Sequence, residues 1–388
     1  MGIYEEALAQ QDFMQAMRHE LHMHPELSFQ EFETTNRIER ELNAMGLTCK
    51  RFEPTGLMTE IKGAHPGKTV LLRADIDALP VTEETGLPFA SQTPGVMHAC
   101  GHDVHTSMLL GAAKILLNHK DEIHGTVRLV FQPAEENGQG AKTIIAQGAA
   151  DGVDYFFGQH VKEAIPVGSV YAAKGPRMAG AREITITVHG KGHHGGMPHQ
   201  ADGVDAVLAA CQIVVSLQSV VSRRLNPADT GVVSIGMITA GPAPNVIPGE
   251  VVMRGTIRYR TEEVHEIIVK NMKDVIENTA KAFGATAELS LSDPFPPVIN
   301  DDWASDCALA AAEKLVGKEN IVPAIPTTGA EDFGNYMSHG KACFFSIGTN
   351  GKYPGHSPKL DIDENVMPYG CSMYVLTALE MLERGNKE

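Results

Sequence analysis

The sequence predicts an α/β protein in which a small domain of ferredoxin-like (βαββαβ) order is inserted into a larger domain built on an open mixed sheet. In the first part of the chain, apolar strands that end in polar side chains alternate with helices. From about residue 181 to 293 the strands instead alternate apolar and polar residues. The first pattern then returns. We therefore expect a discontinuous domain of residues 1–180 and 294–388 and an inserted domain of residues 181–293.

Apolar periodicity and chain-breaking residues place the elements of the larger domain. Residues 4–23 have the apolar spacing of a helix, and Gly46 ends a second helix that starts near residue 31. The run at 70–77 is typical of a buried strand that ends in two carboxylates. Further helices are expected at 107–117, 141–147, 301–316 and 364–384, and further strands at 49–52, 57–61, 126–132, 155–160 and 342–348.

The inserted domain is predicted from the order of its elements. Residues 183–189 alternate as a half-exposed strand does, and residues 203–221 form a long apolar-periodic helix. Two strands, a helix and a last strand follow at 230–238, 250–259, 262–283 and 286–292. This order, strand-helix-strand-strand-helix-strand, is that of the split βαβ fold.

Composition limits the classes of partner. The chain has 388 residues and a formal net charge of −16, which argues against nucleic acid or an anionic membrane. Its six cysteines lack the spacing of a disulfide framework. The first residues lack the pattern of a signal segment, and no apolar run approaches membrane-spanning length. We therefore expect a soluble, reduced, cytoplasmic protein.

The stretch 97–105 is rich in potential metal ligands, because it holds three histidines, one cysteine and one aspartate. It lies between a predicted strand and a predicted helix, where side chains can converge on a cleft. Cys100 and His102 could both bind a borderline metal such as zinc. Taken alone, the stretch fits packing or a surface position equally well.

Three distant segments offer further ligands, namely Glu135 with Glu136, His160, and His356. Ligands that are spread over most of the chain and include a carboxylate favour a catalytic site over a structural zinc site. Five potential ligands exceed the need of one tetrahedral ion. They indicate two ions, which in hydrolases lie about 3.5–4 Å apart.

Glu135 and Glu136 can divide two tasks between them. An exposed acidic pair is the alternative, but the two residues follow a buried strand and Pro133, where exposure is not the default. One carboxylate can bind metal while the other takes a proton from water and passes it to the leaving amine.

As a set, these segments resemble the metal-dependent amidohydrolases of the hippurate hydrolase and indoleacetyl-amino-acid hydrolase type, a branch of the aminoacylase-carboxypeptidase superfamily. The matching segments run in family order over nearly the whole chain. They are residues 73–80, 98–105, 132–136, 158–160, 192–199, 245–248, 255–258, 329–333 and 355–358. The resemblance implies a metallopeptidase-like catalytic domain and a lid or dimerisation role for the inserted domain.

The resemblance also implies a cofactor and a general base. Two divalent ions (Zn, Mn, Ni or Co) would be bound, and Glu135 would be the base. The implied metal ligands are Cys100, His102, Glu136, His160 and His356.

The implied substrate contacts come from the inserted domain and from one later motif. His194 would stabilise the oxyanion, often across a dimer interface, with Asn245 as a second polar group. Arg258 would receive the substrate's α-carboxylate, which guanidinium geometry suits. Gly329 belongs to a motif that borders the substrate pocket.

The chain departs from the family pattern at three places. Distant members carry His-x-Asp where this chain has Asp75-x-Asp77, so we expect both aspartates beside the ligands rather than among them. Val104 stands where close relatives often have Gly, and Thr327-Thr328 where Met or Ser is commoner. Both changes border the pocket and weaken any transfer of substrate.

The expected function is that of a homo-oligomeric amidohydrolase, paired through the inserted domain. It would cleave N-acyl-L-amino acids, hippurate-like or N-acetylated, to a carboxylic acid and a free amino acid. Alternatives on the same scaffold are an N-acetyl-diaminopimelate deacetylase and a metallo-dipeptidase or carboxypeptidase. A metal-binding protein without turnover and a purely structural metal fold are the alternatives from other classes.

Other histidines and cysteines have structural interpretations. His22 and His24 are expected as exposed imidazoles at a helix end before Pro25, although both could be ligands. The other interpretations place His98 and His105 beside the ligands, His193 and His199 in a lid loop, and Cys211, Cys307, Cys343 and Cys371 in packing.

Overall fold

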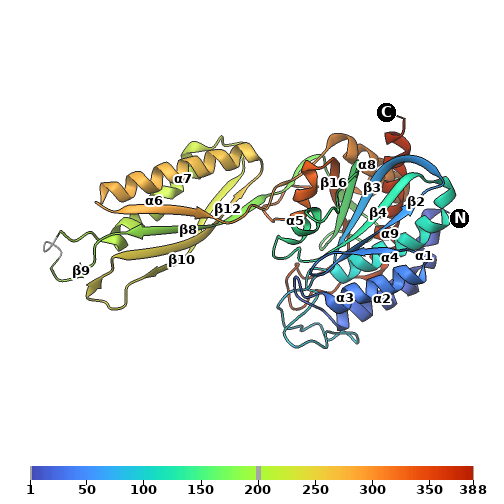
Figure 1. Ribbon diagram of the computed structural model, residues 1–388, viewed down its shortest axis with the longest axis horizontal. Coiled ribbons are helices and arrows are strands. Elements are labelled where there is room, and N and C mark those ends of the chain that lie inside the picture. Colours follow the sequence, from blue (N-terminus) through green and yellow to red (C-terminus); the bar gives the residue numbers. More distant parts are fainter. Residues whose placement is uncertain (1, 198–201, 388) are drawn as a thin grey trace. The chain divides into compact units, whose positions relative to one another are not determined.

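The chain forms two compact units in the computed structural model, which describes residues 2–197 and 202–387 (Figure 1). The large unit comprises Met1–Arg177, Val298–Ile325 and Asp332–Glu388. The small unit comprises Met178–Pro297 and Pro326–Glu331. His199 of the expected lid loop lies outside the described residues. That the small unit acts as a lid or a dimerisation domain stays a prediction.

The large unit is built on an eight-stranded mixed sheet. Its strands, in spatial order, are β1 (Cys49–Arg51), β2 (Leu57–Lys62), β4 (His124–Gln132), β3 (His65–Asp75), β5 (Tyr155–Lys162), β16 (Lys341–Gly348), β6 (Val170–Ala172) and β15 (Ile321–Pro323). The central strands β4, β3, β5 and β16 are mutually parallel. Their carboxyl ends therefore lie at one edge of the sheet, where open α/β proteins place their sites.

Helices cover this sheet (Figure 1). They are α1 (Ile3–Ala9), α2 (Gln11–Met23), α3 (Phe32–Ala44), α4 (His102–Asn118), α5 (Gly140–Ile145), α8 (Asp302–Val316) and α9 (Met367–Gly385). Short 3-10 turns lie at Lys120–Glu122, Lys318–Asn320, Asp332–Ser338 and Glu364–Val366, and β7 (Gly175–Met178) pairs with β14 (Val298–Asn300).

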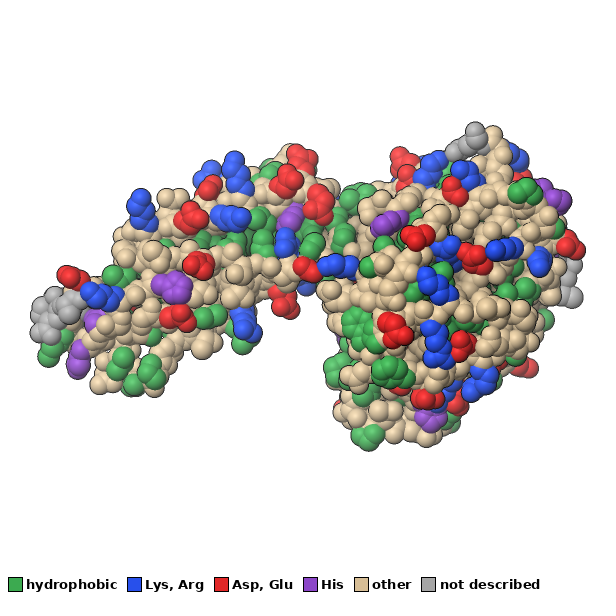
Figure 2. Space-filling model, in the orientation of Figure 1, with side chains coloured by type: hydrophobic (Ala, Val, Ile, Leu, Met, Phe, Trp, Pro, Cys, Tyr) green, Lys and Arg blue, Asp and Glu red, His purple; other side chains and the backbone are tan. Residues whose placement is uncertain are grey.

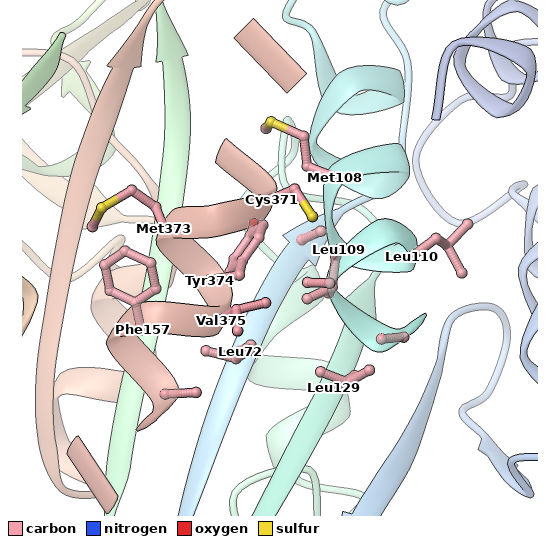
Figure 3. Close-up of a cluster of buried hydrophobic side chains, with 14 of the residues drawn as sticks. Leu72, Met108, Leu109, Leu110, Leu129, Phe157, Cys371, Met373, Tyr374 and Val375 are labelled. Atoms are coloured by element: carbon pink, nitrogen blue, oxygen red, sulfur yellow. The ribbon is translucent and has the colours of Figure 1, made fainter. Parts of the chain in front are cut away.

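The main core lies between α4, α9 and the central strands (Figure 3). Leu109 of α4 and Val375 of α9 are fully buried together with Leu72 of β3 and Phe157 of β5. Burying side chains of this size contributes about 1.5–3 kcal/mol each. The packing holds α4 in place, and its first residue, His102, ends the Cys-Gly-His stretch.

The N-terminal helix of the large unit differs from its prediction. Residues 4–23 form two helices, because Gln10 adopts a backbone conformation outside the helical region and ends α1. His22, expected to be exposed, is only 2% exposed. Its Nδ1 donates to Asp103 at 2.8 Å and its Nε2 to Glu83 at 3.3 Å, so a buried ion pair replaces the predicted exposed helix end.

The small unit has the predicted element order, with a four-stranded antiparallel sheet under two helices. Its strands, in spatial order, are β10 (Gly231–Ala240), β12 (Glu250–Tyr259), β8 (Gly180–His189) and β13 (Thr286–Leu291). The helices are α6 (Ala206–Arg224) and α7 (Glu262–Ala282), and a short pair is formed by β9 (His193–His194) and β11 (Val246–Ile247).

Helix α6 corrects one expectation from the sequence. It is long and apolar enough, by length and composition, to cross a membrane, although no such run was expected. In the structure one face of α6, including Ile213 and Leu217, is fully buried in the core of the small unit. The helix is therefore packed on a sheet by that face.

Charged side chains of both signs are interspersed on the face shown in Figure 2. The large unit has exposed pairs of opposite charge, such as Arg51 with Glu39 and Lys68 with Asp154. Pairs of this kind contribute little to stability because solvent screens them.

The buried His22 should make stability depend on pH. Burial by itself would lower the pKa of His22, but the charges and hydrogen bonds of Asp103 and Glu83 outweigh it and raise the pKa to about 9. A raised folded pKa means that the stabilisation is complete below the unfolded value of about 6.5 and is lost as pH rises through about 9. Urea unfolding should show a loss on the order of 2–3 kcal/mol over this range.

The loss of stability with rising pH should be absent from His22→Gln. It should be unchanged in His24→Gln, because the His24 side chain lies at the same helix end and is 38% exposed. An identical pH dependence in His22→Gln and the wild-type protein would contradict this assignment.

Candidate metal centre

Gly101 places Cys100 and His102 at the start of α4. Its φ of 89° lies in the left-handed region, which glycine adopts without steric cost. A Cβ at this position would lie 2.7 Å from side-chain atoms of Ile362 and Val161. The glycine in the Cys-Gly-His stretch is therefore required by both backbone conformation and space.

His102 is fully buried and oriented by Asp77. Its Nδ1 lies 2.9 Å from the Asp77 carbonyl oxygen and 3.2 Å from Asp77 Oδ1. Because Nδ1 donates to these oxygens, Nε2 is the ring nitrogen that is left for a metal. That atom has no hydrogen-bond partner among the described residues, which is the arrangement of a metal-binding imidazole.

His160 is oriented in the same way at the end of β5. Its Nδ1 donates to the Val161 carbonyl at 2.6 Å, so its Nε2 is directed to the Cys100 Sγ at 3.3 Å. His105, in contrast, uses both ring nitrogens. Its Nδ1 donates to Asp75 at 2.6 Å, and its Nε2 accepts the Val161 N–H at 2.9 Å, which leaves no lone pair for a metal.

The loop after β4 brings both glutamates to the same place. Glu135 is 8% exposed, and the Glu136 side chain is 10% exposed. The Glu136 N–H donates to Asp77 Oδ2 at 3.0 Å, so one aspartate orients two of the candidate ligands. Glu136 Oε1 lies 3.9 Å from His102 Nε2.

His356 completes the group from a loop near the end of the chain. It has a φ of 67°, and its N–H donates to the Ala99 carbonyl at 2.7 Å. This contact ties the loop to the residue next to Cys100. His356 Nε2 lies 3.4 Å from Glu136 Oε2.

The donor atoms form overlapping groups that could each hold an ion. Ligand atoms lie within 4.8 Å of one another in the groups Cys100, His102 and His160; Cys100, Glu136 and His356; and His102, Glu135 and Glu136. Thiolate, imidazole and carboxylate donors suit zinc and similar divalent ions. The residues present therefore fit the metal centre that the sequence predicts.

The candidate donors also shift one another's pKa values. Burial would raise the pKa of the Cys100 thiol, but His160 and His102 hold it well below its usual range. Burial would lower the pKa of His160, and the Cys100 charge raises it to about 9. Burial and the Cys100 charge raise the pKa of Glu136 to about 8. A cation that replaced these protons would meet an anionic donor set.

Asp75 lies next to the candidate donors and is already hydrogen-bonded. It could join an ion with His102 and His105, but its oxygens already bind Arg73 and His105. Arg73 also donates to Asp332 at 2.9 Å, and all of these side chains are fully buried. That Asp75 and Asp77 lie beside the metal ligands rather than among them stays a prediction.

The predicted substrate residues lie in the small unit. His194 of β9 is exposed and pairs with Val246 of β11. Its Nδ1 accepts the Gly196 N–H at 3.0 Å, so its proton lies on Nε2, where it can be donated. Asn245 accepts the Gly195 N–H at 2.9 Å through its carbonyl oxygen, which keeps it next to His194.

Arg258 and Gly329 have simpler surroundings. The half-buried Arg258 guanidinium donates to the Ile257 carbonyl at 3.0 Å, and burial lowers its pKa. The Gly329 carbonyl accepts the Ala179 N–H at 2.9 Å. The roles expected for His194, Asn245, Arg258 and Gly329 stay predictions.

Sequence reasoning did not find the buried hydrogen-bond partners of the residues that surround the candidate ligands. Asp332 accepts hydrogen bonds from Arg73 and Gln132. The signal in the sequence was the arginine inside a buried strand, because a buried guanidinium needs a carboxylate partner. His98, interpreted as lying beside the ligands, is 2% exposed with neither ring nitrogen hydrogen-bonded among the described residues. Burial lowers its pKa to about 4.

Known proteins resemble this chain over nearly its whole length. Residues 71–380 match peptidase family M20/M25/M40. The N-acetyl-L-cysteine deacetylase of Bacillus subtilis (strain 168) is 39% identical over 373 residues, 96% of this chain and 88% of that protein. The IAA-amino acid hydrolase ILR1-like 4 of Arabidopsis thaliana is 37% identical over 381 residues, 96% of this chain and 87% of that protein.

A solved structure supports the same relationship. The Bacillus subtilis YXEP protein, a dinuclear metal-binding peptidase of the M20 family, matches with a TM-score of 0.87 and 37% sequence identity. The match covers 97% of this chain and 99% of that chain.

The buried Arg73 should be needed for stability. Arg73→Met leaves Asp75 and Asp332 buried without this cation, and breaking such a pair costs about 3–5 kcal/mol. Arg51→Met removes an arginine from an exposed pair and should cost less than about 1 kcal/mol. Urea unfolding of both variants measures the difference, and equal losses would contradict the role given to Arg73.

Proposed function

Because this chain belongs to peptidase family M20/M25/M40, it is a hydrolase of amide bonds, and we propose that it cleaves N-acyl-L-amino acids with a dinuclear metal centre. The products would be a carboxylic acid and a free amino acid. One observation carries the proposal. Donors from four distant segments converge in one place, with a further carboxylate, Glu135, beside them.

We assign two divalent ions, Zn, Mn, Ni or Co, to this centre. Two overlapping donor groups that share Cys100 support two ions rather than one, and a solved relative is itself a dinuclear metal-binding peptidase. The residues that would hold the ions are Cys100, His102, Glu136, His160 and His356. When bound, such ions supply Lewis-acid activation of water and of the amide carbonyl.

Glu135 moves the proton in this proposal. Its side chain lies within 4.8 Å of ligand atoms of His102 and Glu136 and is nearly buried. It takes a proton from the attacking water as the oxygen bonds to the carbonyl carbon. It then gives that proton to the leaving nitrogen as the C–N bond breaks, so one carboxylate acts as base and then as acid.

The small unit would provide the substrate contacts. The protonated Nε2 of His194 is a suitable donor to the oxyanion that forms at the carbonyl, with Asn245 as a second polar group. Arg258 would bind the substrate's α-carboxylate, and Gly329 would lie along the pocket.

The relatives support an N-acyl amino acid as the substrate class, since one is a deacetylase of N-acetyl-L-cysteine and another is an IAA-amino acid hydrolase. An N-acetyl-diaminopimelate deacetylase and a dipeptidase or carboxypeptidase are the alternatives. All six cysteines are free thiols, which supports the reducing cytoplasmic location expected from the sequence.

We also propose that two copies pair through the small unit. Strand β10 is at the edge of its sheet, and Met237 and Ile238 are 58% and 52% exposed. On α6, Leu208 and Val215 are 54% and 64% exposed. An unpaired edge with apolar side chains is a surface that another strand can cover. Light scattering of the purified protein should give twice the mass of the chain.

Glu135→Gln should keep its metal and lose nearly all turnover. Glutamine is close in size to glutamate but cannot accept the proton, so kcat should fall by about 10²–10⁴-fold. Metal content measured on the same samples is the control. Full activity in this variant would remove Glu135 as the base.

A substrate panel should separate the proposed function from its alternatives. Benzoyl-glycine, N-acetyl amino acids, N-acetyl-diaminopimelate and a dipeptide would each be assayed with added manganese or zinc. We expect the acylated amino acids to be hydrolysed best. Hydrolysis of the dipeptide alone would favour the peptidase, and no hydrolysis of any compound would refute the enzymatic proposal.

A further inference from the structure

Ala134, directly before Glu135 and Glu136, has an unusual backbone conformation. Its φ is 53°, in the left-handed region that residues with a Cβ rarely adopt, and its side chain is fully buried. Such a conformation costs on the order of 1–3 kcal/mol and persists only when the surroundings hold it. The direction in which Glu135 leaves the chain depends on this residue.

A buried carboxylate lies at the Ala134 N–H. Glu31, at the start of α3, is 0% exposed. Its Oε1 accepts the Ala134 N–H at 2.8 Å, and its Oε2 accepts the Thr55 hydroxyl at 2.6 Å. Both carboxylate oxygens of Glu31 therefore accept hydrogen bonds, and one of these bonds comes from the loop that carries the proposed base.

The N–H two residues after Ala134 also donates to a buried carboxylate. The Glu136 N–H donates to Asp77 Oδ2 at 3.0 Å. The N–H groups of the residues on either side of Glu135 are thus both bound by buried carboxylates, which come from different segments of the chain. Asp77 belongs to the metal centre through His102, whereas Glu31 bonds to the loop through the Ala134 N–H.

Glu31 is itself fixed by neighbouring groups. The Thr35 hydroxyl donates to the Glu31 carbonyl at 2.6 Å and accepts the Gly56 N–H at 3.0 Å. Gly56 packs against the loop, because a Cβ there would lie 2.6 Å from Pro133 Cδ. The start of α3, the turn at Thr55 and the loop after β4 therefore form one hydrogen-bonded assembly.

We propose that Glu31 is a positioning residue that fixes the geometry of Glu135 through the Ala134 N–H. This inference rests on the proposed function of Glu135 as the base. Glu31 does not touch the reacting atoms. It holds the left-handed turn that aims the base, and a displacement of about 1 Å in such a group can lower the rate about 10²-fold.

The chemistry of the contact separates Glu31→Ala from Glu31→Gln. Glutamine keeps an oxygen acceptor for the Ala134 N–H, and its amide can donate to the Thr55 oxygen, whose hydroxyl can rotate. Burial already raises the pKa of Glu31 to about 7, so a neutral side chain of this shape is tolerated at this position. Alanine removes the acceptor altogether.

Steady-state kinetics of metal-loaded protein tests the proposal. Glu31→Ala should lower kcat about 10–100-fold, with KM and metal content unchanged, whereas Glu31→Gln should stay within about threefold of the wild-type kcat. Glu26→Ala is the matched control. The Glu26 carboxylate accepts the N–H groups of Glu33 and Thr34 at 3.1 and 2.8 Å in the same helix, and among the described residues it has no hydrogen bond to the loop. It should lose stability and keep kcat.

Amide hydrogen exchange of a peptide spanning residues 132–138 provides a readout that needs no turnover. Exchange should become faster in Glu31→Ala and stay at the wild-type rate in Glu31→Gln and Glu26→Ala. If the wild-type protein hydrolyses no substrate, the proposed function fails, and exchange still decides whether Glu31 holds the loop.

A wild-type kcat or a wild-type exchange rate in Glu31→Ala would overturn the proposal, and so would loss of the metal from that variant. If Glu31→Ala does not fold, Thr55→Val replaces it, because that variant removes the hydroxyl that orients the other Glu31 oxygen. Thr55→Val should then show faster exchange and a severalfold lower kcat, and unchanged values would again overturn the proposal.

Discussion

The candidate metal centre depends on one constraint: donor atoms from distant segments must be aimed at a shared point, and hydrogen bonds to other atoms of the same residues do this. Asp77 meets this constraint for two donors, because it receives the His102 Nδ1–H and the Glu136 N–H. Val161 meets it for His160 by accepting a hydrogen bond from the ring. In a low-dielectric interior these contacts are strong, and their loss would leave costly unpaired groups.

Turns with left-handed backbone conformations deliver the remaining donors. Gly101, Ala134 and His356 all have φ values in the left-handed region, and each lies in or next to a group of candidate ligands. A carboxylate accompanies two of these turns, Glu31 at Ala134 and Glu163 at Gly355, whose N–H it accepts. Local strain at a functional site is held by the surrounding fold, which links the stability of the large unit to the geometry of its centre.

Much of this could be predicted from the sequence, because the signals were local. Apolar periodicity located the central strands, and the Cys-Gly-His stretch and the Glu135-Glu136 pair pointed to candidate ligands that the fold brings together. The partners of those groups could not be found in this way. Asp332 lies 259 positions from Arg73, and Glu31 lies 103 positions from Ala134, so only the folded chain brings them together. The burial of His22 was missed for the same reason, since its partners Asp103 and Glu83 are distant in the sequence.

The central claim is that one thiolate, three imidazoles and a carboxylate hold two ions in one centre. X-ray absorption of the zinc-loaded protein, with metal quantified on the same sample, tests it most directly. The claim predicts two zinc ions per chain, a single sulfur neighbour at about 2.3 Å that disappears in Cys100→Ser, and a metal–metal distance of about 3.5–4 Å. One ion per chain, or a sulfur signal that persists without Cys100, would contradict it.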